Sequence, residues 1–211
     1  MDQDAPRARE RRLARIKLSD QVAEDIRRRI ARDRLRPGDR LPHERALMDH
    51  YGCSKGTIRE ALLQLQDEGL VVRQGHRGTV VSACTEVEAV ELFRIRRSIE
   101  GRGIRRAVAG RSRSLVADLR MLAEAMETAA EAGDELELAS LDRDFHRRLF
   151  ADAELPALDT ILHRCLVHNH RYKISRSLGP RDLRQTALRH EAIIAAIAQG
   201  DAGAAATALQ H

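Results

Sequence analysis

The chain has 211 residues, of which 43% are hydrophobic, 33% are charged and only 2% are aromatic. Because Trp is absent, the core must be built from aliphatic side chains, which favours packed helices. No apolar run reaches the roughly 18 residues of a membrane-spanning helix, and the charged N-terminus is unlike a secretory signal. The three cysteines are isolated, which argues against disulfides or a cysteine zinc site and predicts a cytoplasmic protein.

The net charge of +5 is unevenly distributed. Residues 1–82 contain 18 Lys and Arg against 13 Asp and Glu, whereas residues 83–211 contain 19 of each kind. The excess of positive charge therefore belongs to the N-terminal part, as a DNA-binding module requires. Five arginines between Arg7 and Arg15 predict a flexible basic arm over residues 1–16, which either contacts DNA phosphates or is simply solvated.

A first helix is predicted over residues 18–35, because Val22, Ile26 and Ile30 fall on one stripe at helical spacing. Ser19 is the candidate N-cap. The opposite side of this helix is rich in arginine. We therefore expect the apolar stripe to pack against the elements that follow and to complete their core.

Residues 41–81 predict two short helices followed by a β-hairpin. A break at residues 51–54 separates the helices, Ser54 is placed to cap the second one, and Gly69 ends it. Two β-branched runs, 70–72 and 79–81, are joined by a loop that contains glycine. This order predicts a winged helix-turn-helix over residues 17–82.

The second of these helices presents a face that suits DNA. Its first turns carry hydroxyl and cationic side chains outside the apolar stripe, and the hairpin loop carries an imidazole and a guanidinium between glycines. These groups are Ser54, Lys55, Thr57 and Arg59 on the helix, and His76 and Arg77 in the loop. A helix N-terminus with such groups suits phosphates and base edges in a major groove. The alternative is a small helical hairpin with ordinary surface charge.

Residues 83–211 predict helices without any strand. A capping box at residues 85–88 starts the first helix, and the expected spans are 86–108, 114–132, 134–151, 156–175, 180–200 and 201–211. The fold class is therefore mainly α, with an antiparallel all-helical bundle behind the winged helix-turn-helix. In the first bundle helix, the side chains predicted to point inward are Val90, Phe93, Ile95, Ile99 and Ile104.

Polar residues recur on the inward faces of this bundle. Asp142 and His146 are four residues apart on an apolar helix face, where a carboxylate and an imidazole need partners. His190 and His211 lie ten residues before Gly200 and ten after Asp201, so an antiparallel hairpin returns them to one level, about 15 Å from the turn. One carboxylate and three imidazoles suit zinc or another divalent first-row metal. The alternative is a set of structural histidines.

Three histidines on the fourth bundle helix are further candidates for the metal site, namely His163, His168 and His170. Most of them are expected to be surface or packing residues. An Asp and three His can also activate water in a metal-dependent hydrolase. Since no clear general base accompanies them, we do not expect an enzyme.

The stretch LPHERALMDHYGCSKGTIREALLQLQDEGLVVRQGHRGTVV resembles the N-terminal module of GntR-family transcription regulators, whose pattern is roughly LPSERELAxxxGVSRxTVREALxxLxxEGLVxxxxGxGTFV. Residues 83–211 are similar to the FCD ligand-binding domain of the FadR-like subfamily. The segments that carry this second resemblance are RRSIE at 96–100, DRDFH at 142–146 and HEAIIAAIAQGD at 190–201.

The resemblance implies roles for individual residues. The implied DNA contacts are Arg45, Ser54, Lys55, Thr57 and Arg59, with His76, Arg77 and Gly78 on the wing. The implied metal ligands are Asp142, His146, His190 and His211, and Arg96 is implied to line the effector pocket and pair with a carboxylate. Two positions depart from the pattern. Lys55 replaces a common arginine and makes a point-charge contact, and Gly56 replaces a larger residue.

These observations predict a DNA-binding transcription regulator, expected to be a repressor. A homodimer would bind a pseudo-palindromic double-stranded operator, because one winged helix makes few contacts. A small organic acid bound at the metal site would modulate operator affinity. Zinc is the expected metal, with nickel and manganese as alternatives. The rival interpretation keeps DNA binding but makes the metal purely structural, with no effector.

Overall fold

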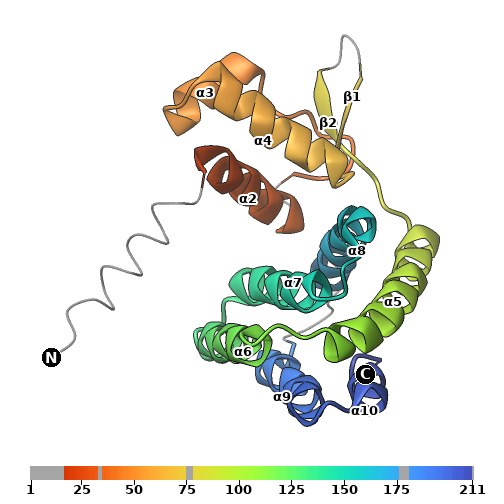
Figure 1. The fold of residues 1–211 in the computed structure, drawn as a ribbon. Helices are drawn as coiled ribbons and strands as arrows, with labels where there is room; N and C mark the ends of the chain where they lie inside the picture. Colours follow the sequence, from red (N-terminus) through yellow and green to blue (C-terminus); the bar gives the residue numbers. More distant parts are fainter. Residues whose placement is uncertain (1–16, 33–34, 75–77, 176–180, 211) are drawn as a thin grey trace, which may run out of the picture. The chain divides into compact units, whose positions relative to one another are not determined.

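The computed structural model describes residues 17–32, 35–74, 78–175 and 181–210 (Figure 1). These residues fall into two compact units, one ending at Ala83 and the other beginning at Cys84. The predicted basic arm, the wing residues His76 and Arg77, and the predicted ligand His211 lie outside the described residues.

The first unit contains three helices and a β-hairpin. In chain order these are α2 (Leu18–Ala31), α3 (Glu44–Tyr51), α4 (Lys55–Asp67), β1 (Val71–Arg73) and β2 (Thr79–Val81). The two strands are antiparallel, with Val72 opposite Val80. The predicted winged helix-turn-helix is therefore confirmed, although its first helix ends at Ala31 rather than at residue 35.

Local signals explain these boundaries. The Oγ of Ser54 accepts the backbone N–H of Thr57 at 3.2 Å and so caps α4 as predicted. Gly52 ends α3 at a φ of +60°, a conformation that glycine adopts without strain. The Ser19 prediction was wrong, because Lys17 occupies the N-cap position and Ser19 is buried inside the first turn.

A small aliphatic core holds the first unit together. Ile26, Ile30, Leu47, Ile58 and Leu65 are all at most 1% exposed. These side chains come from all three helices, and α2 packs against α4 as the sequence pattern predicts. At the end of α4, a bidentate ion pair adds to this packing.

That ion pair joins Arg27 of α2 to Glu68, the C-cap residue of α4. The Nε and Nη2 of Arg27 donate to the two carboxylate oxygens of Glu68 at 2.8 and 2.9 Å. The pair ties α2 to the base of α4 through two parallel hydrogen bonds.

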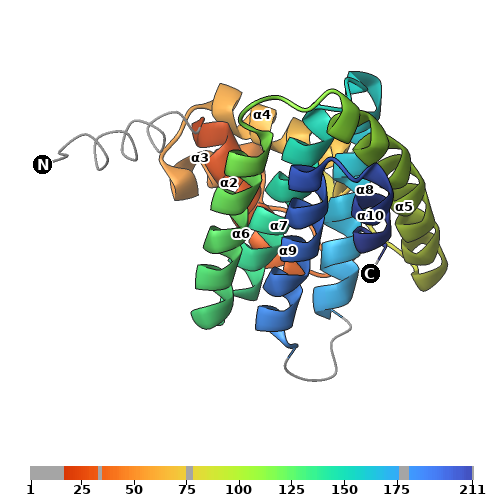
Figure 2. The ribbon, with the colours of Figure 1, turned by 60° about the horizontal axis from the view of Figure 1, so that its bottom comes forward.

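The second unit is a helical bundle (Figure 2). Its helices are α5 (Glu86–Ala109), α6 (Leu115–Glu131), α7 (Glu135–Ala151), α8 (Pro156–Ser175), α9 (Leu183–Gln199) and α10 (Ala202–Ala208). Helix α6 packs against α7 and α9, while α5 packs against α8 and α10. Across the described part of the chain, no helix is long and apolar enough to cross a membrane.

The capping box that starts α5 is present, with Thr85 and Glu88 exchanging hydrogen bonds. The inward face predicted for α5 was wrong in part. Ile104 is buried and Ile99 is partly buried, but three of the five residues are exposed: Val90 at 44%, Phe93 at 37% and Ile95 at 44%. The buried stripe of this helix instead includes Arg96, Glu100, Gly103, Ile104 and Ala107.

Gly103 explains how α5 comes close to α7. A Cβ atom at this position would lie 2.4 Å from Cε2 of Phe150. At Gly101, two residues earlier, a Cβ atom would meet nothing within 4 Å. Only glycine at residue 103 therefore allows the backbone of α5 to lie against the Phe150 ring without a shift in either helix.

We predict that Gly103→Ala destabilises the bundle by about 1–3 kcal/mol, because overpacking outweighs the gain in helix propensity. Gly101→Ala is the matched control and should leave stability unchanged or raise it by up to ~1 kcal/mol. Urea unfolding followed by circular dichroism, with hydrogen exchange of α5 and α7, measures both effects. Equal behaviour of the two variants would contradict the packing argument.

Candidate functional site

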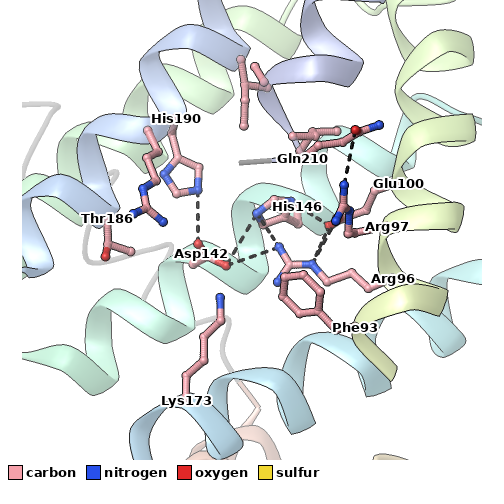
Figure 3. A pocket seen from close by; sticks show the side chains of 14 residues that line it. Phe93, Arg96, Arg97, Glu100, Asp142, His146, Lys173, Thr186, His190 and Gln210 are labelled. Carbon is pink, nitrogen blue, oxygen red and sulfur yellow. Dashed lines mark hydrogen bonds and ion pairs between the residues drawn. The ribbon is translucent and has the colours of Figure 1, made fainter. Parts of the chain in front are cut away.

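A carboxylate and two imidazoles meet inside the bundle (Figure 3). Asp142 and His146 lie one turn apart on α7, and His190 faces them from α9. All three are buried, and one potential ligand atom from each lies within 4.8 Å of the others. The structure thus brings together three of the four predicted metal ligands, while the fourth, His211, lies outside the described residues.

Asp142 is at the centre of this cluster. Its Oδ1 lies 3.2 Å from Nε2 of His190, and its Oδ2 lies 3.6 Å from Nε2 of His146. A third imidazole approaches from α8, since Nε2 of His170 lies 2.9 Å from Oδ2. His168 and His170 are both buried, so of the two positions expected, surface or packing, they take the packing one. His170 is therefore a further candidate ligand.

The charge state of the cluster suits a cation. Burial alone would raise the pKa of Asp142, but its interactions with the imidazoles of His146, His170 and His190 outweigh burial and hold this pKa well below its usual value. Burial, only partly opposed by Asp142, lowers the pKa of His170 to about 4. The centre thus offers an ionised carboxylate and a neutral imidazole at neutral pH, which are the forms that bind metals.

Two further observations fit a metal. Oδ2 of Asp142 is buried, and the Nε2 atoms of His170 and His146 lie 2.9 and 3.6 Å from it, so a carboxylate oxygen and two imidazole nitrogens converge there. The Nδ1 of His190 donates to the carbonyl oxygen of Ala187 at 3.0 Å, which holds the ring so that its Nε2 faces Asp142. Metal-binding histidines are commonly oriented in this way.

Arg96 and Glu100 of α5 border the cluster. The Nε of Arg96 lies 3.1 Å from both carboxylate oxygens of Glu100, and its Nη2 donates to Nε2 of His146 at 2.9 Å. Glu100 also lies 2.8 Å from Nδ1 of His146. Arg96 therefore sits beside the candidate metal ligands, at the place that the sequence predicts for an effector contact.

A small pocket opens onto these side chains. The volume of this pocket is about 90 Å³. Its buried part is formed by Arg96, Asp142, His146 and His190, and its exposed part includes Phe93, Lys173 and Arg189. The pocket connects the candidate metal centre to solvent, so a small molecule can reach this centre from outside.

The predicted DNA contacts lie on the first unit. Arg45, Ser54, Lys55 and Arg59 are exposed, and Thr57 is half-buried. Gly78 has a φ of +74°, so the end of the wing loop uses a conformation that favours glycine. The N-terminal end of α4 thus presents cations and a hydroxyl to solvent.

One carboxylate that the sequence interpretation missed organises these cations. Glu44, in the first turn of α3, lies 3.1 Å from Nε of Arg59, 3.5 Å from Nη2 of Arg73 and 3.9 Å from Nζ of Lys55. The three cations come from α4 and β1. No sequence pattern indicated this role of Glu44, because its partners approach only when α3 packs against α4 and β1 folds back.

Comparison with known families matches both units. Residues 18–81 match the family described as "Bacterial regulatory proteins, gntR family", and residues 91–211 match the FCD domain. The FCD match alone covers more than half of the chain.

Individual relatives agree with these matches. The HTH-type transcriptional repressor NanR of Citrobacter rodentium is 31% identical over 167 residues, which cover 70% of this chain and 62% of that protein. NanR of Enterobacter sp. strain 638 is 42% identical over 73 residues, which cover 34% of this chain and 28% of that protein. The chain thus spans less than two thirds of the length of these curated relatives.

Among solved structures, Escherichia coli McbR/YncC has a TM-score of 0.74 and 24% identity, covering 92% of each chain. At this identity, the similarity supports the fold alone.

We predict that His190→Ala weakens zinc binding by at least about 100-fold, since even partners of metal ligands contribute roughly 10- to 100-fold. Competition with a chromophoric chelator measures the affinity, and His50→Ala on α3 is the control. Full zinc occupancy with unchanged affinity would remove His190 from the ligand set. The same titration of His170→Ala and His211→Ala identifies the fourth ligand.

Proposed function

Because this chain belongs to the gntR family of bacterial regulatory proteins and carries an FCD domain, we propose that it is a DNA-binding repressor controlled by a small organic acid. The family is one of regulators and not of enzymes. The observation that carries the DNA-binding part is the N-terminal end of α4, where exposed Lys55 and Arg59 lie beside the Ser54 cap. We place its action in the cytoplasm.

Helix α4 acts as the recognition helix in this proposal. Its N-terminal N–H groups and positive dipole end attract phosphate, while Arg59 reaches base edges in the major groove. Lys55 supplies a point charge without bidentate geometry. A pseudo-palindromic operator needs two such helices, so the functional form is a homodimer.

The bundle supplies control. Asp142, His146 and His190 would hold a divalent metal, zinc being the best fit to imidazole and carboxylate ligands, with nickel or manganese as alternatives. A bound metal supplies positive charge that attracts a carboxylate of the acid. Arg96 competes with a metal for the lone pair on Nε2 of His146, and when displaced it can pair with that carboxylate. Acid binding changes operator affinity only if the acid prefers one arrangement of the DNA-binding units over another.

The second candidate function keeps DNA binding and makes the metal structural. The observation that favours it is that Arg96 already has a carboxylate partner in Glu100, so the centre is charge-paired without an acid. Chelation that unfolds the bundle, combined with operator affinity that no organic acid changes, would support this candidate over the first.

We predict that Arg59→Ala weakens binding to the operator, selected from a pool of random DNA, by about 1–3 kcal/mol. The reason is the loss of a base-edge or phosphate contact at the start of the recognition helix. Fluorescence anisotropy measures the affinity, and Arg94→Ala on α5 is the control for loss of an exposed arginine. Unchanged affinity would refute the assignment of α4.

We further predict that Glu44→Gln strengthens binding to random DNA roughly two- to fivefold, because each of its exposed ion pairs is worth only ~0.2–1 kcal/mol. Lys55, Arg59 and Arg73 would be released for phosphates but would lose their fixed positions. The ratio of operator affinity to random-DNA affinity should therefore fall. Asp49→Asn on α3 is the matched control. An equal change in both variants would show that only net charge matters.

A further inference from the structure

The pocket in the bundle carries more positive than negative charge. Its charged lining comprises four cations, Arg96, Arg97, Lys173 and Arg189, against the carboxylates of Glu100 and Asp142. Arg96 and Glu100 neutralise each other, and Asp142 faces the imidazoles. Within the described ranges, Lys173 and Arg189 form no ion pair. Arg97, which donates to the amide oxygen of Gln210, likewise has no anionic partner among the described residues. Three cations of the pocket thus remain without an anion, even before a metal adds its own charge.

Lys173 contributes to this excess of positive charge. Figure 3 shows its side chain extending from α8 toward Asp142 across the pocket. Its Nζ lies 5.3 Å from the centre of the Phe93 ring. Burial and the charge of Arg96 lower the pKa of Lys173, and Arg181 and Arg189 add to this effect. The ammonium group is therefore held in a region of positive potential that Asp142 offsets only in part.

The size of the pocket limits what can occupy it. The pocket volume of about 90 Å³ is roughly three times the ~30 Å³ that one water molecule occupies in the liquid. Phe93 and Ile193 provide apolar lining between the polar groups. These polar groups with apolar lining between them fit a short carbon chain with a charged group at each end. The pocket is too small for a sugar chain or a fatty acid.

We propose that the effector is a small dianion whose first anionic group binds at the Asp142–His146–His190 centre with Arg96, and whose second group is bound by Lys173 and Arg189. This inference rests on the proposed function and specifies the chemical class of its acid. A dicarboxylate carries one charge on each group, whereas the phosphate of a phosphorylated hydroxy acid carries about two at pH 7. Both have the two anionic groups that define the dianion meant here, and the experiment separates them.

The test uses the full chain loaded with zinc and isothermal titration calorimetry. Succinate and butyrate share a four-carbon chain and differ by one carboxylate, and phosphoglycolate and glycolate differ by one phosphate. At least one dianion should bind ten- to 100-fold more tightly than its monoanionic partner, since charge-assisted hydrogen bonds are strong in a partly buried site. The pair with the larger ratio identifies the second group as carboxylate or phosphate.

Variants then locate the second group. Lys173→Met and Arg189→Gln should each reduce the dianion-to-monoanion ratio about tenfold while leaving the monoanion affinity within about twofold. Arg184→Gln is the matched control, because this exposed arginine of α9 does not line the pocket. If the preference for the dianion survives in both variants, the second group binds elsewhere and the inference is wrong.

Failure of this inference is distinguishable from failure of the proposed function. If monoanions bind and alter operator affinity while dianions bind no better, the dianion is refuted and the acid-responsive regulator stands. If none of the four acids binds, both the dianion and the acid-responsive part of the proposed function are refuted. DNA binding is then still judged separately through Arg59→Ala.

Discussion

A carboxylate buried in a helical bundle determines much of the second unit. Asp142 is only 9% exposed, and an ionised carboxylate at that depth is stable only beside cations or hydrogen-bond donors. The chain meets this requirement with His146 one turn away on α7, His170 from α8 and His190 from α9. The polar centre therefore specifies how three helices pack, because an apolar core alone would accept several registers.

Sequence patterns predicted the first unit well because its signals are local. The Ser54 cap and the Gly52 ending depend on residues within one or two turns, and the pairing of the strands follows from a short loop. Asp142 and His146 were predictable for the same reason, since four residues span one helical turn. The hairpin spacing related His190 only to His211, so its position beside Asp142 was predicted from the inward face of its helix and from the family resemblance.

The remainder depended on contacts between distant segments. Periodicity classes Phe93 as core and Arg96 as surface, yet Arg96 is buried because Glu100 pairs with it. The sequence did not distinguish His170 from the other histidines of α8. Residues 165–171 of this helix are all buried, so no single apolar stripe separates its core face from its surface face. The role of Glu44 depends on β1 folding back onto α3. In each case, the partner that decides the position is absent from the local sequence.

The contact between Gly103 and Phe150 also has a mechanical consequence. At this contact the backbone of α5 lies directly against the ring of Phe150. No flexible side chain of α5 is therefore available at residue 103 to adjust when α5 and α7 move relative to each other. From Gly103 to the start of α5 at Glu86 the helix extends about 25 Å. A tilt of about 5° at this fulcrum displaces the start of α5 by about 2 Å, by simple lever geometry along a rigid helix. Arg96 lies on that lever arm, so a small adjustment in the pocket is magnified at the N-terminal end of α5, which follows the first unit in the chain.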